Sequence, residues 1–257
     1  MNNVPTVSDT KRAFYAAHAN PISSIYRRVV EELLVEMHLL SVNSTFAYDP
    51  IFALGVISSY DRFMSSYRPE KDRESILNAI CNSLSGALSQ DVETFRRDAS
   101  AIADAAQNVD SKTLTGWLCG DLSDAPEIIV KTIREIAERD TFKYSRIFGI
   151  GLFTLLERNN VELAQQKSDE RAKLIQPIAE HLGLPSEKLS KDLDNYVSNL
   201  ERMAQAKVIM EEAVEAERKK REKREQEQKN KATSAEDSSG GSEEPTQEST
   251  DKAASGS

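Results

Sequence analysis

Apolar residues recur along most of this chain at the spacing of an α-helix. Between residues 22 and 40 they fall three or four positions apart, which places them on one face of a helix. That face consists of Ile22, Tyr26, Val29, Val30, Leu33, Met37 and Leu40. No segment alternates apolar and polar residues with the period of two that a half-buried strand requires. The pattern predicts an all-α protein.

Residues that cap helices stand where the apolar pattern begins. Thr6 or Ser8 can cap a first helix that runs to Ala17, because a hydroxyl accepts hydrogen bonds from the free amides of the first turn. Asp49 followed by Pro50 is a cap with a first-turn proline, and it predicts the start of a third helix. Further helices are predicted over Pro69–Ser85, from Ser89 through Ala106, over Asp110–Gly120, from Asp124 through Ile136, and over Asp169–His181, where Pro177 should kink or split the helix.

The segment Phe142–Glu157, FKYSRIFGIGLFTLLE, is the most hydrophobic of the chain and predicts a central core helix. Gly149 and Gly151 lie inside it, and each costs about 1 kcal/mol relative to alanine. Close approach of a neighbouring helix explains them best, because the strand and the third glycine of a nucleotide-binding loop are absent. Phe148 and Leu152 are therefore predicted in the core, and Gly149→Leu is predicted to destabilise the protein by overpacking.

The longest helical stretch begins at Ser186, and no glycine or proline follows until Gly240. Its apolar residues alternate four and three apart, which is the spacing of a coiled-coil seam. The charged pairs that follow, such as Glu217–Arg221 and Arg221–Glu225, indicate a solvated extension. The seam consists of Leu189, Leu193, Tyr196, Leu200, Met203, Met210 and Val214, with Lys207 at one position.

Three parts are therefore expected in one all-α chain. Residues 1–185 form a single multi-helix globular domain, and residues 186–231 form a long charged helix that is coiled-coil-like in its first half. Residues 232–257 are rich in Ser, Glu, Gly and Thr and form a disordered acidic tail, because they bury too little apolar surface to offset the entropy of ordering.

Charge and composition limit the classes of molecule that the chain is expected to bind. Its 257 residues carry a net charge of −9, and its basic run Arg218–Arg224 is interleaved with glutamate, so nucleic acid is not expected as a partner. The longest apolar runs, Ile51–Ile57 and Ile147–Phe153, are far shorter than the ~20 residues of a membrane-spanning helix. The N-terminus lacks the apolar region of a secretory signal. Cys81 and Cys119 are interpreted as small buried hydrophobic residues.

No catalytic, cofactor-binding or metal-binding residue is predicted, so the protein is not expected to be an enzyme. His18, His38 and His181 do not follow a glutamate by three residues, which excludes the Glu-x-x-His ligands of a di-iron bundle. Glu32 and Glu36 share one helix face, which is interpreted as a solvated acidic face rather than a general acid/base pair. Nucleotide-binding, hydrolase and zinc motifs are absent from the sequence.

Three stretches resemble the thylakoid formation protein family, the photosystem II biogenesis proteins of cyanobacteria and chloroplasts. They are TVSDTKRAFYAAHANPISSIYRRVVEELLVEMHLL, FAYDPIFALGVISSYDRFM and FKYSRIFGIGLFTLLE, and the resemblance covers roughly residues 5–215. Because no transit peptide precedes Thr6, the chain is similar to a cyanobacterial rather than a plant member.

This resemblance implies a non-enzymatic, all-α accessory protein that is peripheral to the thylakoid membrane on its cytoplasmic side. It implies a role in thylakoid biogenesis and in photosystem II assembly and repair. The implied partners are FtsH-type AAA protease complexes and photosystem II components or assembly intermediates.

Two functions remain open from the sequence. The first is an interaction protein that binds and stabilises a membrane-bound protease, and the second is a membrane-organising protein that binds lipid or pigment. An exposed apolar groove would favour the second, and a mixed, aromatic-rich patch would favour the first. Five tyrosines are candidate contact residues, although core packing suits most of them better: Tyr15, Tyr26, Tyr48, Tyr60 and Tyr67.

Overall fold

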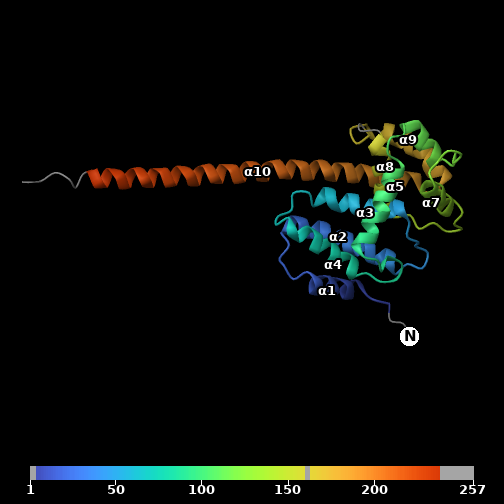
Figure 1. Ribbon diagram of the computed structural model, residues 1–257, viewed down its shortest axis with the longest axis horizontal. Coiled ribbons are helices and arrows are strands. Elements are labelled where there is room, and N and C mark those ends of the chain that lie inside the picture. Colours follow the sequence, from blue (N-terminus) through green and yellow to red (C-terminus); the bar gives the residue numbers. More distant parts are fainter. Residues whose placement is uncertain (1–3, 160–162, 238–257) are drawn as a thin grey trace, which may run out of the picture. The chain divides into compact units, whose positions relative to one another are not determined.

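The computed structural model describes residues 4–159 and 163–237, and within these ranges it contains helices and no strand (Figure 1). The all-α prediction is therefore confirmed. The helices of the described ranges are α1 (Val7–Ala17), α2 (Ser24–Ser41), α3 (Pro50–Phe63), α4 (Lys71–Asn82), the 3₁₀ helix η1 (Gly86–Leu88), α5 (Val92–Ala105), α6 (Ser111–Leu118), α7 (Glu127–Ala137), α8 (Arg146–Asn159), α9 (Ser168–His181) and α10 (Ser186–Asp237).

The first residues of several helices are set by local capping. The Thr6 hydroxyl accepts from the amide of Asp9 at 3.2 Å, and the Asp9 carboxylate accepts from the amide of Thr6 at 3.0 Å, which together form a capping box at the start of α1. Asp49 caps α3 by accepting from the amide of Phe52 at 2.8 Å, as its position before Pro50 predicted.

Several predicted helix starts were wrong by a few residues: α4 begins at Lys71 and not Pro69, α7 begins at Glu127 and not near Asp124, and α5 and α8 also begin later. The cap of α5 is Asp91 and not Ser89, because the Asp91 carboxylate accepts from the amide of Thr94 at 2.7 Å, whereas Ser89 ends the short helix η1. Helix α8 begins at Arg146 rather than at Phe142, since the hydroxyl of Ser145 accepts from the amide of Phe148 at 3.1 Å and acts as the cap.

Helix α9 continues across Pro177, so the split is wrong and the alternative, a kink at Pro177, stays a prediction. Pro177 has no amide hydrogen, and it lies on an exposed side of the helix where that loss is tolerated. Ile175 and Ile178 on the other side are buried in the core and hold both halves of α9 in place.

Helices α3 and α8 make the most extensive contact between elements and form the centre of the fold. They touch through glycines, because a methyl group on Gly55 would lie 1.9 Å from the carbonyl oxygen of Ile147. A methyl group on Gly151 would lie 1.9 Å from the carbonyl oxygen of Ile51. The close helix approach predicted for the glycines of α8 is thus present at Gly151, and Phe148 and Leu152 are buried as predicted.

The other helices pack against this central pair or against one another (Figure 1). Helix α5 packs against α3, and α1 contacts both α2 and α4. Helix α6 contacts α7, α8 and α9 and links these helices to the centre. One continuous apolar core results, with contributions from every helix up to the first turns of α10.

The chain divides into two compact units, Met1–Ala204 and Gln205–Ser257. The division falls inside α10 and not at the expected end of the globular domain at residue 185. Leu189, Leu193 and Tyr196 explain the difference, because these seam residues are buried in the core of the first unit. Pairing of the later seam with another helix therefore stays a prediction.

Helix α10 continues to Asp237, past the expected end of the charged helix at residue 231. No glycine or proline occurs between Ser186 and Asp237, so no strong helix breaker ends the helix at residue 231. Residues 238–257, which make up the rest of the predicted disordered tail, lie outside the described residues.

Candidate binding surface

An open groove with a volume of about 460 Å³ runs along the first unit. Exposed residues of α2 and of the first turns of α10 form its two walls, and buried residues of α3 and α8 form its floor. We call it the α2–α10 groove. It is lined by Ser24, Ile25, Arg28, Val29, Glu32, Leu33 and Glu36 of α2, Ser59, Tyr60 and Phe63 of α3, Arg146, Ile147 and Ile150 of α8, and Asn195, Tyr196, Asn199, Arg202 and Met203 of α10.

Apolar side chains are accessible inside this groove. Ile25 is 44% exposed, and Val29, Phe63 and Met203 are each partly exposed. Tyr196 packs edge-on against Phe63, with ring centres 5.8 Å apart, and closes the floor between α3 and α10. Accessible apolar residues rimmed by polar ones are typical of a surface that binds another molecule.

Charged residues line the rim of the groove. Arg28 pairs with Glu32, one turn later on α2, at 2.9 Å, and Arg146 pairs with Glu36 at 2.6 Å. Among the side chains that the structure describes, Arg202 makes no ion pair. Three arginines therefore stand against two glutamates, and the rim carries a local positive charge on a chain that is acidic as a whole.

Glu32 and Glu36 of α2 do not form a uniformly solvated acidic face. Glu32 is exposed, but Glu36 is partly buried and joins α2 to α8 through Arg146. Glu31 lies four residues after Arg27, but it pairs with Lys11 at 2.9 Å and accepts from the hydroxyl of Tyr15 at 2.8 Å. Glu31 and Glu36 thus join α2 to other helices, whereas Glu32 pairs within α2, and the geometry does not place Glu32 and Glu36 as an acid/base pair.

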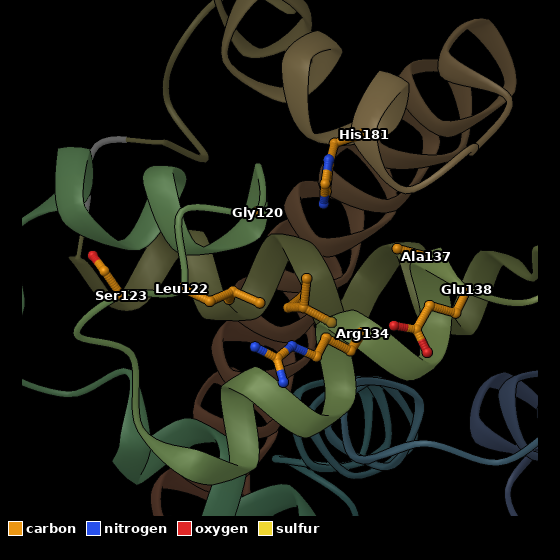
Figure 2. A pocket seen from close by; sticks show the side chains of 8 residues that line it. Gly120, Leu122, Ser123, Arg134, Ala137, Glu138 and His181 are labelled. Atoms are coloured by element: carbon orange, nitrogen blue, oxygen red, sulfur yellow. The ribbon is translucent and has the colours of Figure 1, made fainter.

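A second hollow of about 440 Å³ lies beside α7 and α9 (Figure 2). His181 points from the end of α9 toward the loop that contains Gly120, and Arg134 and Glu138 of α7 line the opposite side. Gly120 has a φ of +95°, and a methyl group on it would lie 2.4 Å from the His181 ring. The imidazole is exposed, and the Ser123 hydroxyl that lines the hollow donates to Asp121 at 3.1 Å rather than to His181, so the described residues form no pair of nucleophile and base here.

The other two histidines hold α1 in place. His38 Nδ1 lies 2.8 Å from the hydroxyl oxygen of Thr10, and both side chains are buried. His18 Nδ1 lies 3.0 Å from the hydroxyl oxygen of Ser75 on α4. The three histidines are thus distributed over separate places, and no group of His, Cys, Asp and Glu within the described ranges could hold a metal ion.

Most of the candidate tyrosines belong to the core. Tyr26, Tyr60 and Tyr67 are buried, and the Tyr60 hydroxyl donates to the carbonyl of Arg73 at 2.5 Å. The Tyr48 hydroxyl donates to Asp98 at 2.9 Å, and burial raises the pKa of Tyr48 above its usual value. Tyr15 alone among these five is exposed, on α1.

Neither cysteine has the properties of a reactive thiol. Cys81 is buried, and burial raises the pKa of its thiol to about 12. Burial also raises the pKa of the partly covered Cys119. A thiol with a raised pKa carries little thiolate at neutral pH, so neither cysteine has the character of a nucleophile.

The groove could not be located from the sequence. Its walls come from α2 and α10, which are distant in the chain, and its arginines Arg28, Arg146 and Arg202 lie far apart in the sequence. One signal was present, since Met203 continues the apolar seam beyond the residues that the core buries. None of the described helices combines the length and apolar character needed to cross a bilayer.

The fold defines an all-helical protein with an open, charge-rimmed surface groove. Comparison with known sequences assigns it further, because the thylakoid formation protein family model matches residues 6–225. The chain belongs to this family.

Individual relatives agree with the assignment. Protein Thf1 of Synechococcus elongatus is 51% identical over 221 residues, which cover 85% of each chain. Protein Thf1 of Gloeothece citriformis is 47% identical over 85% of this chain and 96% of its own length. A solved structure of Psb29 is 39% identical, with a TM-score of 0.62 over 77% of this chain and 98% of that one. The family is thus supported by sequence and by fold.

Proposed function

We propose that this protein is a non-catalytic accessory factor in thylakoid formation and in photosystem II assembly and repair. It acts by binding and stabilising membrane-bound FtsH-type AAA proteases, and it is held peripherally on the cytoplasmic side of the thylakoid membrane. Membership of the thylakoid formation protein family supports a role in thylakoid formation. The protease as partner is part of the proposal.

The α2–α10 groove is the observation that carries this proposal. Its partly exposed Ile25, Phe63 and Met203 offer apolar anchors, and Arg28 and Arg202 lie at the rim. An amphipathic helix binds to such a groove by placing its apolar face on the floor. By contrast, the buried polar groups described above hold helices together, as the pairs His38–Thr10 and Tyr48–Asp98 show.

A capture experiment tests the proposal. The purified full chain is immobilised and incubated with detergent-solubilised thylakoid membranes, and bound FtsH-type protease is measured by immunoblot. Ile25→Asp places a charge in the groove, and we expect it to reduce capture about tenfold, because loss of an apolar anchor costs ~1–2 kcal/mol. Leu39→Asp is the matched control, since Leu39 is on the same helix, is 56% exposed and does not line the groove.

The outcomes are distinct. Strong capture by the wild type and by Leu39→Asp, with weak capture by Ile25→Asp, supports the proposal. Absence of protease on the wild-type chain contradicts the proposed partner, and equal capture by all three proteins contradicts the groove as the binding surface.

A second candidate function is a membrane-organising protein that binds lipid or pigment. The apolar floor of the same groove favours it, because an acyl chain or a pigment ring needs an apolar site of this size. The charged rim and the acidic net charge favour a protein partner. Flotation with protein-free liposomes separates the two functions.

A further inference from the structure

A short apolar stripe lies on the part of α10 that belongs to the second unit. Ala206, Ile209, Ala213 and Val214 occupy positions i, i+3, i+7 and i+8 of the helix, so they share one face. Ile209 is 66% exposed and Val214 is 67% exposed, which makes them the most exposed large apolar side chains of the described residues. We call these four residues the α10 stripe.

The residues beside the α10 stripe are acidic. Glu212 and Glu217 make no ion pair among the side chains that the structure describes, whereas Glu215 pairs with Lys219 at 2.9 Å. The stripe is therefore an apolar helix face with uncompensated negative charge next to it. The segment from residue 206 to 217 is about 18 Å long, at 1.5 Å per residue.

The α2–α10 groove has the opposite properties. Its accessible apolar side chains lie within a rim that has an excess of positive charge, and Arg202 makes no ion pair among the described side chains. Burial of Ile209 and Val214 would remove apolar area from water, and the glutamates would approach the arginines of the rim. Each copy of the chain thus carries a concave groove with excess positive charge and a convex apolar helix face with excess negative charge, and the two complement each other.

We propose that the α2–α10 groove binds the α10 stripe of a second copy of this chain. Each copy contributes one groove and one stripe, so a closed pair contains the contact twice. The inference concerns the purified chain alone and does not depend on the protease proposed above. A groove filled by a second copy is closed to other helices, so self-association competes with partner binding.

Sedimentation velocity of the full chain over the micromolar range tests this inference. We expect the wild type to form a pair that weakens as salt is raised, since the charges at the contact are exposed. Arg202→Glu changes the groove, Ile209→Glu changes the stripe, and both are expected to leave monomers. Leu39→Glu changes an exposed leucine elsewhere and is expected to pair like the wild type.

Mixing the two monomeric variants distinguishes this contact from others. The Arg202→Glu protein keeps an intact stripe and the Ile209→Glu protein keeps an intact groove, so the mixture is expected to form a weaker pair with one contact. If Ile209→Glu abolishes pairing and Arg202→Glu does not, the stripes pair with each other as a coiled coil and the inference is overturned. A wild type that stays monomeric throughout the range also overturns it. Circular dichroism of each variant verifies that its helices are intact.

Discussion

Gly55 of α3 and Gly151 of α8 face each other at the point where the two central helices cross. A methyl group added to Gly151 would lie 2.9 Å from the amide nitrogen of Gly55, and one added to Gly55 would lie 3.0 Å from that of Gly151. Backbone therefore meets backbone at the centre of the fold. Each glycine costs about 1 kcal/mol in a helix, and the close packing of Ile51 and Ile147 around the crossing offsets that cost.

The crossing predicts an order among glycine substitutions. Gly151→Ala should lower the free energy of unfolding by ~1–3 kcal/mol or more, because its methyl group meets the backbone of Ile51, which cannot move without shifting α3. Gly149→Ala should cost less, since its methyl group meets only the ends of the Tyr144 and Leu189 side chains. Gly149→Leu should be damaging, as its larger side chain exceeds that space. Urea unfolding followed by circular dichroism measures all three.

Gly116 provides the control for this series. It lies in α6 with no atom closer than 4.0 Å to an added methyl group, so Gly116→Ala should be neutral or stabilise by about 0.5–1 kcal/mol. If Gly151→Ala were as stable as the wild type, the contact between α3 and α8 would be looser than described here.

The raised pKa of the buried Asp49 carboxyl predicts that the stability of the protein depends on pH. Burial raises its pKa to about 6 in the folded protein, from an ordinary value of 3.8, although the hydrogen bond from the Phe52 amide opposes this rise. Between these two values the folded state holds a proton that the unfolded state has lost. The contribution of Asp49 to stability therefore falls as pH rises from about 4 to about 6, by at most ~1.4 kcal/mol per pH unit.

Asp49→Asn isolates this effect. Asparagine keeps the capping hydrogen bond and carries no charge, so the variant should lose this part of the pH dependence and be the more stable protein above pH 6. Asp91→Asn is the control at an exposed cap. Hydrogen bonds from Thr94 lower the pKa of Asp91, so its contribution is present above the unfolded pKa and is lost as the pH falls. A pH profile of Asp49→Asn identical to the wild type would contradict the raised pKa.

The two cysteines should differ in accessibility. Cys81 is 1% exposed with a pKa of about 12, and Cys119 is partly exposed. A thiol reagent at neutral pH should modify Cys119 slowly in the folded protein and Cys81 only after global unfolding. Mass spectrometry of Cys119→Ser, with and without urea, measures the rate at Cys81. Modification of Cys81 under native conditions at the rate of an unfolded peptide would show that the core opens locally.

Membrane retention should depend on proteins and not on lipid. Within the basic run, Arg218 pairs with Glu222 at 3.4 Å, Lys219 with Glu215 at 2.9 Å and Arg221 with Glu225 at 3.0 Å. Much of its charge is thus compensated along the helix, and at physiological salt it acts only within about 8 Å. We expect most of the purified protein to stay unbound in flotation with protein-free liposomes of thylakoid lipid composition.

A charge reversal makes this test decisive. If the wild type floats and a variant with Arg218, Lys219, Lys220 and Arg221 changed to Glu does not, lipid binding is primary and the membrane-organising function replaces the adaptor function. If both stay unbound while native thylakoids retain the wild type, a membrane protein holds it.

The sequence by itself determined the α-helices and the first residues of some of them, such as α3 and α10. The apolar period of α2 is a local property, and so is the capping by Thr6 and Asp49, because a cap contacts only residues of the next turn. The same holds for the core helix around Phe148, whose composition alone marks it as buried. The three family stretches are likewise properties of the sequence.

Only the tertiary structure decided which surfaces these helices form. Glu36 was predicted to be solvated because its partner, Arg146, is 110 residues away in the chain. The sequence gives no sign that Gly55 contacts α8, because that contact exists only in the folded structure. The seam of α10 likewise did not show that Tyr196 is buried in the globular core whereas Ile209 is exposed. The physical reason is that helix formation depends on neighbours within one or two turns, whereas a groove depends on the angle and distance at which distant helices cross.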